Sequence, residues 1–214
     1  MNIVPYNVHL MNTRDREESL TLEILETIEQ QNDVTQRHLA DRLGVALGLA
    51  NSYLKRCVRK GLVKIHQAPA NRYLYYLTPK GFAEKSRLTA QYLSSSFDFY
   101  RRAGDSLTEI YEQCRKNGCE RILFCGVSEL AEIASLRASE HGIHFIGTFD
   151  PSSELKKFLH MPVWRSLADV DDYDACLLTS LTQANDLYSM LIQTLEPEKI
   201  LVPSILGINE KIAE

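Results

Sequence analysis

The feature that most constrains the fold is a pair of short amphipathic helices joined by a glycine turn. Thr35 is a favourable N-cap for the first helix, and Gly44 supplies the left-handed residue that ends this helix and makes the turn. The second helix covers residues 46–60 and ends at Gly61. The sequence therefore predicts a helix-turn-helix unit in the first third of the chain.

The second of these helices has two chemically different sides. On a helical wheel at about 100° per residue, apolar residues gather on one arc, and polar and basic residues gather on the opposite arc without any acid. A helix in the major groove of DNA needs this chemistry, because Asn reads base edges while Lys and Arg meet phosphates. The apolar arc, expected to face the core, holds Leu47, Ala50, Leu54, Cys57, Val58 and Gly61. The opposite arc holds Gly48, Asn51, Ser52, Lys55 and Arg59, with Arg56 beside it.

Two segments with strand composition follow at residues 62–67 and 72–77, and residues 68–71 form a turn between them. Polar and basic side chains lie on or near the tip of this expected hairpin, where they would touch the backbone or the minor groove of DNA. These side chains are Lys64, His66, Asn71 and Arg72. At the start of the first helix, Thr35, Gln36 and Arg37 complete the predicted DNA-binding residues.

The runs RKGLVKI (residues 59–65) and YLYYLTPKG (residues 73–81) resemble the winged-helix repressors of the MarR type. In that family a basic helix end leads into the first wing strand, and the second strand ends in LTxxG before a linking helix. The resemblance implies a winged helix-turn-helix domain over residues 19–90 that binds double-stranded DNA in a transcriptional regulator. The alternative is a winged helix that is used only for protein contacts.

Charge is divided unequally along the 214 residues. Residues 1–90 contain 13 Lys and Arg against 9 Asp and Glu, a net charge of +4, whereas residues 91–214 contain 11 against 19, a net charge of −8. A DNA-binding domain joined to an acidic partner domain would have this asymmetry. Because affinity from phosphate contacts rises with the number of cations engaged, a charge of +4 is modest for a monomer on DNA, and we expect a homodimer.

The remaining composition argues against several classes of protein. The five cysteines are an odd number without CxxC or zinc-ligand spacing, and most are expected to be small core residues. The first residues lack the pattern of a secretory signal, and no apolar stretch approaches the ~20 residues of a membrane span. We therefore expect a cytoplasmic protein with no metal and no membrane partner.

Four segments are expected along the chain. Residues 1–18 are polar and are expected to form a flexible N-terminus, followed by a helix over residues 20–31 capped by Ser19. This helix begins the winged helix domain, residues 19–90. A helical linker, residues 91–118, separates it from the C-terminal domain.

The linker is a candidate dimer interface. A helix is expected to start at Pro79, to break at Gly104, and to be followed by a further helix that ends at Gly118. The apolar content of the whole stretch from Pro79 to Asn117 exceeds what a small winged domain can bury alone, so we expect the dimer to form through these helices. The apolar residues are Phe82, Leu88, Tyr92, Leu93, Phe97, Phe99 and Tyr100.

From Cys119 onward, apolar strands alternate with helices, which predicts a parallel sheet with helices on both faces. The expected strands cover residues 121–127, 143–150, 161–164, 173–180 and 199–204, and the expected helices cover residues 129–141 and 183–195. The predicted fold class is thus an α+β winged helix-turn-helix followed by a small α/β Rossmann-like domain, residues 119–214.

The turn after the first of these strands, GVSELA at residues 126–131, stands where dinucleotide-binding folds place G-x-G-x-x-G/A. Gly126 fits the first glycine and Ala131 the third, but Ser128 replaces the second, which weakens the case for NAD. Ser128 could bind a phosphate at the helix N-terminus, and Asp150 could bind a ribose diol. The alternative is that Ser128 is only a helix cap and Asp150 only a turn residue. Ser180 and Thr182 would flank the same crevice.

Residues 126–150 also resemble the nucleotide-fold half-domains attached to sugar-modifying enzymes, in which GAGE-A turns open the same strand-turn-helix. The whole chain is similar to bacterial winged-helix regulators with such a C-terminal domain, some of them linked to envelope or exopolysaccharide genes. The architecture resembles the Rex redox repressors, which join a winged helix to an NADH-binding domain, although the missing second glycine counts against Rex itself. The resemblances identify no ligand or cofactor. The position of the turn at a helix N-terminus favours a phosphate-bearing ligand, such as a mononucleotide or a sugar nucleotide.

Nothing in the sequence indicates a catalytic site. His141, His144 and His160 have no acid or nucleophile at motif spacing, so we expect the chain not to be an enzyme. Two alternatives stay open: a nucleotide-sugar-type enzyme with a fused winged helix, and a regulator whose C-terminal domain binds only protein.

Overall fold

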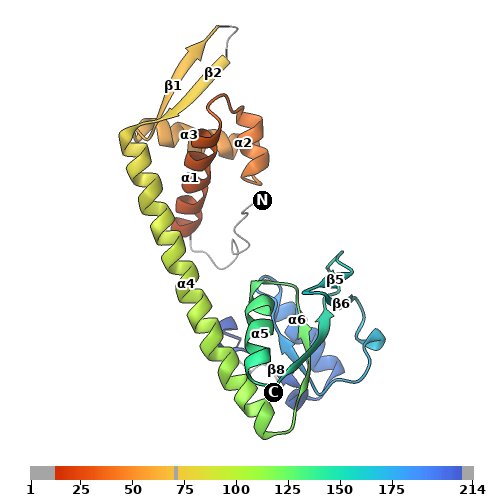
Figure 1. Cartoon of the computed structure of the whole chain (residues 1–214). Coiled ribbons are helices and arrows are strands. Elements are labelled where there is room, and N and C mark those ends of the chain that lie inside the picture. The colour runs from red at the N-terminus through yellow and green to blue at the C-terminus, as the bar shows by residue number, and fades with distance from the viewer. Residues whose placement is uncertain (1–12, 70–71, 209–214) are drawn as a thin grey trace. The chain divides into compact units, whose positions relative to one another are not determined.

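The computed structural model describes residues 13–69 and 72–208 (Figure 1). The chain divides into two compact units, Met1–Ser96, here the N-terminal unit, and Phe97–Glu214, here the C-terminal unit. Asn71 and most of the predicted flexible N-terminus lie outside the described residues.

The N-terminal unit is built from three helices and a hairpin. Leu25 of α1, Leu39 of α2 and Leu54 of α3 are buried in one common core. The hairpin extends from these helices (Figure 1), and the Tyr75 amide donates to the Asn32 carbonyl at 2.7 Å, which ties the hairpin to the segment after α1. The elements are α1 (Thr13–Gln30), α2 (Gln36–Arg42), α3 (Leu47–Arg59), β1 (Val63–Ala68), β2 (Arg72–Leu77) and the first part of α4 (Pro79–Lys116).

The first helix, α1, begins at Thr13 and not after Ser19, so the prediction of a flexible segment up to residue 18 is wrong for residues 13–18. Within the added turn, the Glu17 carboxylate forms ion pairs with Arg56 and Lys60 at the C-terminal end of α3. The sequence offers no local signal for these partners.

The structure explains why the LTxxG segment has threonine at Thr78 and glycine at Gly81. The Thr78 hydroxyl accepts a hydrogen bond from the Gly81 amide at 3.0 Å and donates one to the Gly61 carbonyl at 2.6 Å. A side chain at Gly81 would place its Cβ 2.1 Å from the Leu62 carbonyl oxygen. Thr78 therefore caps α4, and Gly81 allows α4 to lie directly against the start of the hairpin.

The helix α4 runs unbroken from Pro79 to Lys116, so the predicted break at Gly104 is wrong. A Cβ at Gly104 would lie 3.0 Å from the guanidinium group of Arg137, which belongs to α5. The glycine therefore serves a close contact with another helix, and a single interior glycine weakens a helix without ending it.

The C-terminal unit contains a six-stranded sheet with the order β5-β6-β4-β3-β7-β8. The strands β6, β4, β3, β7 and β8 pair in parallel, whereas the edge strand β5 is antiparallel to β6. The parallel part was predicted, and β5 was not. The strands are β3 (Arg121–Cys125), β4 (His144–Phe149), β5 (Lys157–Phe158), β6 (Met161–Trp164), β7 (Ala175–Leu178) and β8 (Ile200–Leu201). The helices are the end of α4, α5 (Glu129–Glu140) and α6 (Ala184–Thr194), with 3-10 turns at Leu167–Asp169, Pro197–Lys199 and Ser204–Leu206.

Both faces of this sheet are covered by helices. On one face Phe124 of β3 packs in a cluster with Tyr111 of α4 and Leu130 of α5. On the other face Leu123 belongs to a cluster with Leu191 of α6. Successive residues of β3 thus enter opposite cores, which is why this strand has a continuous apolar sequence. Within the described parts of the chain, no helix is both long and apolar enough to cross a membrane.

Candidate nucleic-acid interface

An exposed row of small, polar and basic residues runs along α3. Gly48, Ser52, Lys55 and Arg59 are all exposed, and their spacing of four, three and four residues places them on one side of the helix. The opposite side, with Ala50, Leu54 and Cys57, is buried in the core. The two faces predicted for this helix are therefore present over most of its length.

Two predicted members of this face, Asn51 and Arg56, lie beside the row and are half-buried. The Arg56 guanidinium forms an ion pair with Glu17 of α1 and lies 5.8 Å over the centre of the Tyr53 ring. The side-chain oxygen of Asn51 is buried and, among the described residues, has no hydrogen-bond partner. Arg56 is thus held by its own domain, while the Asn51 amide stands at the edge of the exposed row.

The first turn of α3 differs from the prediction. Leu47 was expected to face the core, but its side chain is 45% exposed, and that of Leu49 is 41% exposed. The buried residues of α3 begin only at Ala50, since the core ends before the first turn. A helical wheel gives the direction of a side chain but not how far along the helix the core extends. In contrast, Cys57 is buried, and this burial raises the pKa of its thiol to about 11.

At the start of α2, Thr35, Gln36 and Arg37 are exposed. The Thr35 hydroxyl accepts a hydrogen bond from the His38 amide at 3.1 Å, which confirms Thr35 as the N-cap of this helix.

The hairpin carries its basic residues on one face. Lys64 lies opposite Tyr76, His66 opposite Leu74, and Ala68 opposite Arg72. Directly opposed residues share a face and side chains alternate along each strand, so Lys64, His66 and Arg72 project from the same side. All three are exposed. The hairpin therefore presents a second basic surface close to α3 in the sequence.

In the C-terminal unit, the predicted ligand turn is closed by its own chain. Gly126 has φ +107°, and a Cβ there would lie 2.5–2.6 Å from atoms of Ser180. Asp150 is buried; its carboxylate accepts hydrogen bonds from the Val127 amide at 2.9 Å and from the Ser152 amide at 3.0 Å. The structure thus brings Gly126, Asp150 and Ser180 together at the carboxyl ends of β3, β4 and β7.

The hydroxyl groups at this turn are also engaged. Ser128 accepts a hydrogen bond from the Ala131 amide at 3.3 Å, so it is the N-cap of α5, and it donates to the Thr179 carbonyl. The Thr179 hydroxyl donates to the Gly126 carbonyl at 2.6 Å, a contact that the sequence did not predict. Thr182 is exposed in the same loop as Ser180, whose hydroxyl accepts from the Gln183 amide at 3.0 Å. Within the described residues, no group of three or more His, Cys, Asp or Glu could hold a metal ion.

Comparison with known proteins agrees with the fold of the N-terminal unit. Residues 18–64 match the family model described as winged helix-turn-helix DNA-binding. The N-terminal unit therefore has a winged helix-turn-helix fold, with α2 and α3 as its helix-turn-helix and β1–β2 as its wing. No curated protein sequence matches the chain.

Several solved structures of regulators resemble part of the chain. One is MepR, a transcription regulator of the Staphylococcus aureus multidrug efflux pump MepA, with 22% identity over 39% of this chain and 61% of MepR and a TM-score of 0.34. Another is the PcaV transcriptional regulator from Streptomyces coelicolor, with 23% identity over 41% of this chain and 76% of PcaV and a TM-score of 0.31. Wild-type MarR from E. coli has 24% identity over 40% of this chain and 75% of its own, with a TM-score of 0.31.

Proposed function

We propose that this chain is a transcriptional regulator that binds double-stranded DNA with α3 in the major groove. The observation that carries the proposal is the exposed row of Gly48, Ser52, Lys55 and Arg59, which contains hydroxyl and cationic groups and no acid. Hydroxyl groups can contact base edges and phosphates, whereas Lys and Arg neutralise phosphates. Among winged-helix regulators, the LTPKG sequence of residues 77–81 favours the MarR type.

The wing supplies the second contact in this proposal. Lys64, His66 and Arg72 project from one face of the hairpin, where they can reach the phosphate backbone or enter the minor groove. Two separate basic surfaces on one small domain fix its position on the duplex as well as its affinity.

Selection of binding sequences from random duplex DNA, followed by gel-shift titration of the best duplex, tests this function. Lys55→Ala and Arg59→Ala should each weaken binding to all sequences and reduce the dependence of log K on log salt by about 1. Asn51→Ala should alter the preference at one base pair by less than the ~1–3 kcal/mol of a bidentate contact, because the Asn51 side-chain oxygen is buried. Lys157→Ala, which removes an exposed cation from β5, is the matched control and should leave DNA affinity and its salt dependence unchanged. Failure of the wild-type chain to bind any duplex at low salt would overturn the proposal.

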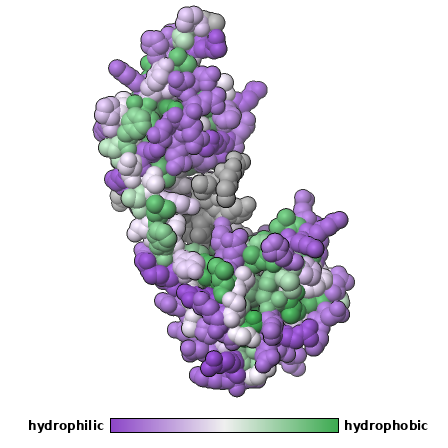
Figure 2. Space-filling model, in the orientation of Figure 1, coloured by the Kyte–Doolittle hydropathy of each residue, from purple (hydrophilic) through white to green (hydrophobic). Residues whose placement is uncertain are grey.

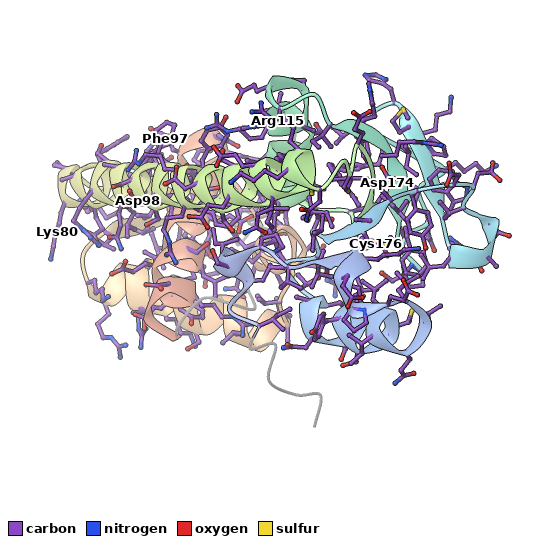
Figure 3. All side chains as sticks on the ribbon, turned by 90° about the horizontal axis from the view of Figure 1, so that it is seen from below. Lys80, Phe97, Asp98, Arg115, Asp174 and Cys176 are labelled. Carbon is purple, nitrogen blue, oxygen red and sulfur yellow. The ribbon has the colours of Figure 1, made fainter. Side chains whose placement is uncertain are left out.

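The regulator is, we propose, a homodimer that pairs through α4. Phe82, Leu93, Phe97 and Tyr100 are exposed, and their spacing places them on one side of this helix. Hydrophobic residues appear along α4 in Figure 2, and the Phe97 side chain projects from the helix in Figure 3. A run of large exposed apolar side chains marks an interaction site more often than a solvated surface. A dimer would also double the number of cations that meet the DNA.

The C-terminal unit is, in the same proposal, a Rossmann-like domain that binds a phosphate-bearing ligand at residues 126–131. Numbered in chain order, its parallel strands lie across the sheet as 3-2-1-4-5, and dinucleotide-binding folds share this order. In such sheets ligands bind beyond the carboxyl ends of the strands, beside the first strand, which here is β3. Because the amides of Gly126, Val127 and Ala131 donate hydrogen bonds within the chain, a phosphate would meet the amides of residues 128–130 at the start of α5. Ser128 stands where NAD-binding turns have a glycine, and this favours a nucleotide or sugar nucleotide over NAD.

Thermal unfolding with a panel of mononucleotides, dinucleotides and sugar nucleotides tests the sensing role. A ligand at 100 times its Kd should stabilise the folded chain by ~2.7 kcal/mol. It should also change operator affinity, and operator-bound protein should bind the ligand with the reciprocal change. Turnover of a sugar nucleotide would instead favour an enzyme. If no ligand of the panel changes the thermal stability, a domain that binds only protein is favoured.

A further inference from the structure

Two exposed leucines flank an exposed glycine in the first turn of α3. Leu47 is 45% and Leu49 41% exposed, and Gly48 between them is exposed as well. The core of the domain begins only at the next residue, Ala50. The packing of the N-terminal unit therefore leaves more than two fifths of each leucine exposed.

Gly48 is not required by the conformation or packing of its own domain. It is absent from the glycines with positive φ, and a Cβ built on it meets no atom within 4 Å. Gly81 of the same unit differs, because its Cβ would lie 2.1 Å from the Leu62 carbonyl oxygen. A glycine inside a helix is less favourable than alanine. The open space over Gly48 is thus available for a partner that approaches the helix backbone.

The same end of α3 is open to a partner's polar groups. The N-cap residue, Ala46, makes no side-chain hydrogen bond to the helix, and the first turn contains no acid. The exposed amides and the positive end of the helix dipole therefore point outward without a competing carboxylate. The row continues from Gly48 through Ser52 and Lys55, so a polyanion that meets the first turn would also meet these side chains.

We propose that Leu47 and Leu49 contact thymine methyl groups in the major groove and that Gly48 permits the close approach of the helix. This inference rests on the proposed DNA-binding function. Recognition helices contact base edges with their N-terminal residues, and thymine is the base that presents a methyl group there. An apolar side chain in this position distinguishes thymine from the other bases, because none of them carries a methyl group in the major groove. Leu47 and Leu49 are therefore determinants of sequence specificity.

Replacement of thymine by deoxyuridine tests this contact, because it removes only the methyl group. In the best duplex selected from random DNA, each thymine is replaced in turn and the affinity of the full chain is measured. At the contacted positions, the wild-type chain should lose about 4-fold per methyl, the value of one buried carbon. Leu47→Ala or Leu49→Ala should bind the thymine duplex more weakly and should no longer distinguish thymine from uracil at one position.

The controls separate this inference from the general function. Leu136→Ala removes a 59%-exposed leucine from α5 and should leave DNA binding unchanged. Gly48→Ala should raise Tm through better helix propensity and yet weaken binding to the selected duplex. If the wild-type chain binds all uracil duplexes as tightly as the parent, the methyl contact is wrong while the DNA-binding function stands. If no duplex is selected, the function itself fails.

Discussion

Arg56 of α3 forms an ion pair with Glu17 of α1. Lys60, one turn further along the chain, lies 3.8 Å from the same carboxylate. A single acid thus holds the C-terminal end of the proposed recognition helix against the first helix. The pair engages one cation of the polar face predicted for α3.

Glu17→Gln should therefore change DNA binding more than stability. Both side chains are more than a third exposed, so the loss of the pair should cost only about 0–1 kcal/mol of unfolding free energy. The released Arg56 and Lys60 should strengthen binding to all duplexes and steepen its salt dependence. Gel-shift titrations at several salt concentrations measure both effects. Glu112→Gln, at an exposed position on α4, removes the same charge elsewhere and should give a smaller increase.

Features that depend on neighbouring residues in the chain were predictable from the sequence. Thr35 and Ser128 cap the helices that follow them, and each uses an amide three residues further on. The strands β3, β4 and β7 were predictable because a strand buried on both faces needs an unbroken apolar run. In both cases the cause lies within a few residues of the effect.

Features that depend on distant residues were missed. The sequence predicted a helix end at Gly104. The glycine is instead needed for close contact with the side chain of Arg137, which lies on another helix. The β5–β6 hairpin was missed because its turn uses Leu159 and His160 at positive φ, whereas glycine or asparagine usually marks such turns. The hydrogen bonds of Asp150 could not be predicted either, since its position alone fits both a ribose ligand and a turn.

The proposed dimer predicts a specific effect of a charge on α4. Phe97 is 60% exposed and lies on the apolar side of this helix. Phe97→Glu should shift the chain from dimer to monomer at micromolar concentration and weaken operator binding, since a dimer reads two half-sites ~34–36 Å apart. Sedimentation equilibrium or light scattering measures the mass. Leu136→Glu introduces the same charge at an exposed leucine of α5 and should leave the dimer intact. A monomeric wild-type chain, with and without DNA, would contradict the dimer.

Asp174 makes the stability of the C-terminal unit dependent on pH. Its carboxylate accepts hydrogen bonds from the backbone amides of Arg121 at 2.7 Å and Glu120 at 2.8 Å, and these bonds lower the pKa of Asp174 in the folded state. A carboxyl with a lowered folded pKa stabilises the fold above its unfolded pKa of about 3.9, and this contribution is lost as the pH falls through the folded pKa.

Asp174→Asn should accordingly lower the unfolding free energy at pH 7, and the difference from the wild type should shrink steadily in acid. Urea unfolding across this pH range measures the difference. The neighbouring Asp171→Asn, also at an exposed position, is the charge-matched control and should show no such trend. An equal gap between wild type and Asp174→Asn at all pH values would mean that the carboxylate charge does not contribute.

Gly126 should be much less replaceable than Gly142, another glycine of the C-terminal unit with positive φ. Its φ of +107° disfavours any side chain, and a Cβ would also lie 2.6 Å from the backbone nitrogen of Ser180. Gly142 has φ +71° but meets no atom within 4 Å, so Gly142→Ala isolates the conformational cost, about 1–3 kcal/mol at most. Gly126→Ala should exceed this cost by roughly a further 1–3 kcal/mol, because the backbone of Ser180 must move. Urea unfolding of both variants measures the difference. Equal destabilisation by Gly126→Ala and Gly142→Ala would show that the backbone of Ser180 moves without an energetic cost. The turn after β3 could then open for a ligand without cost.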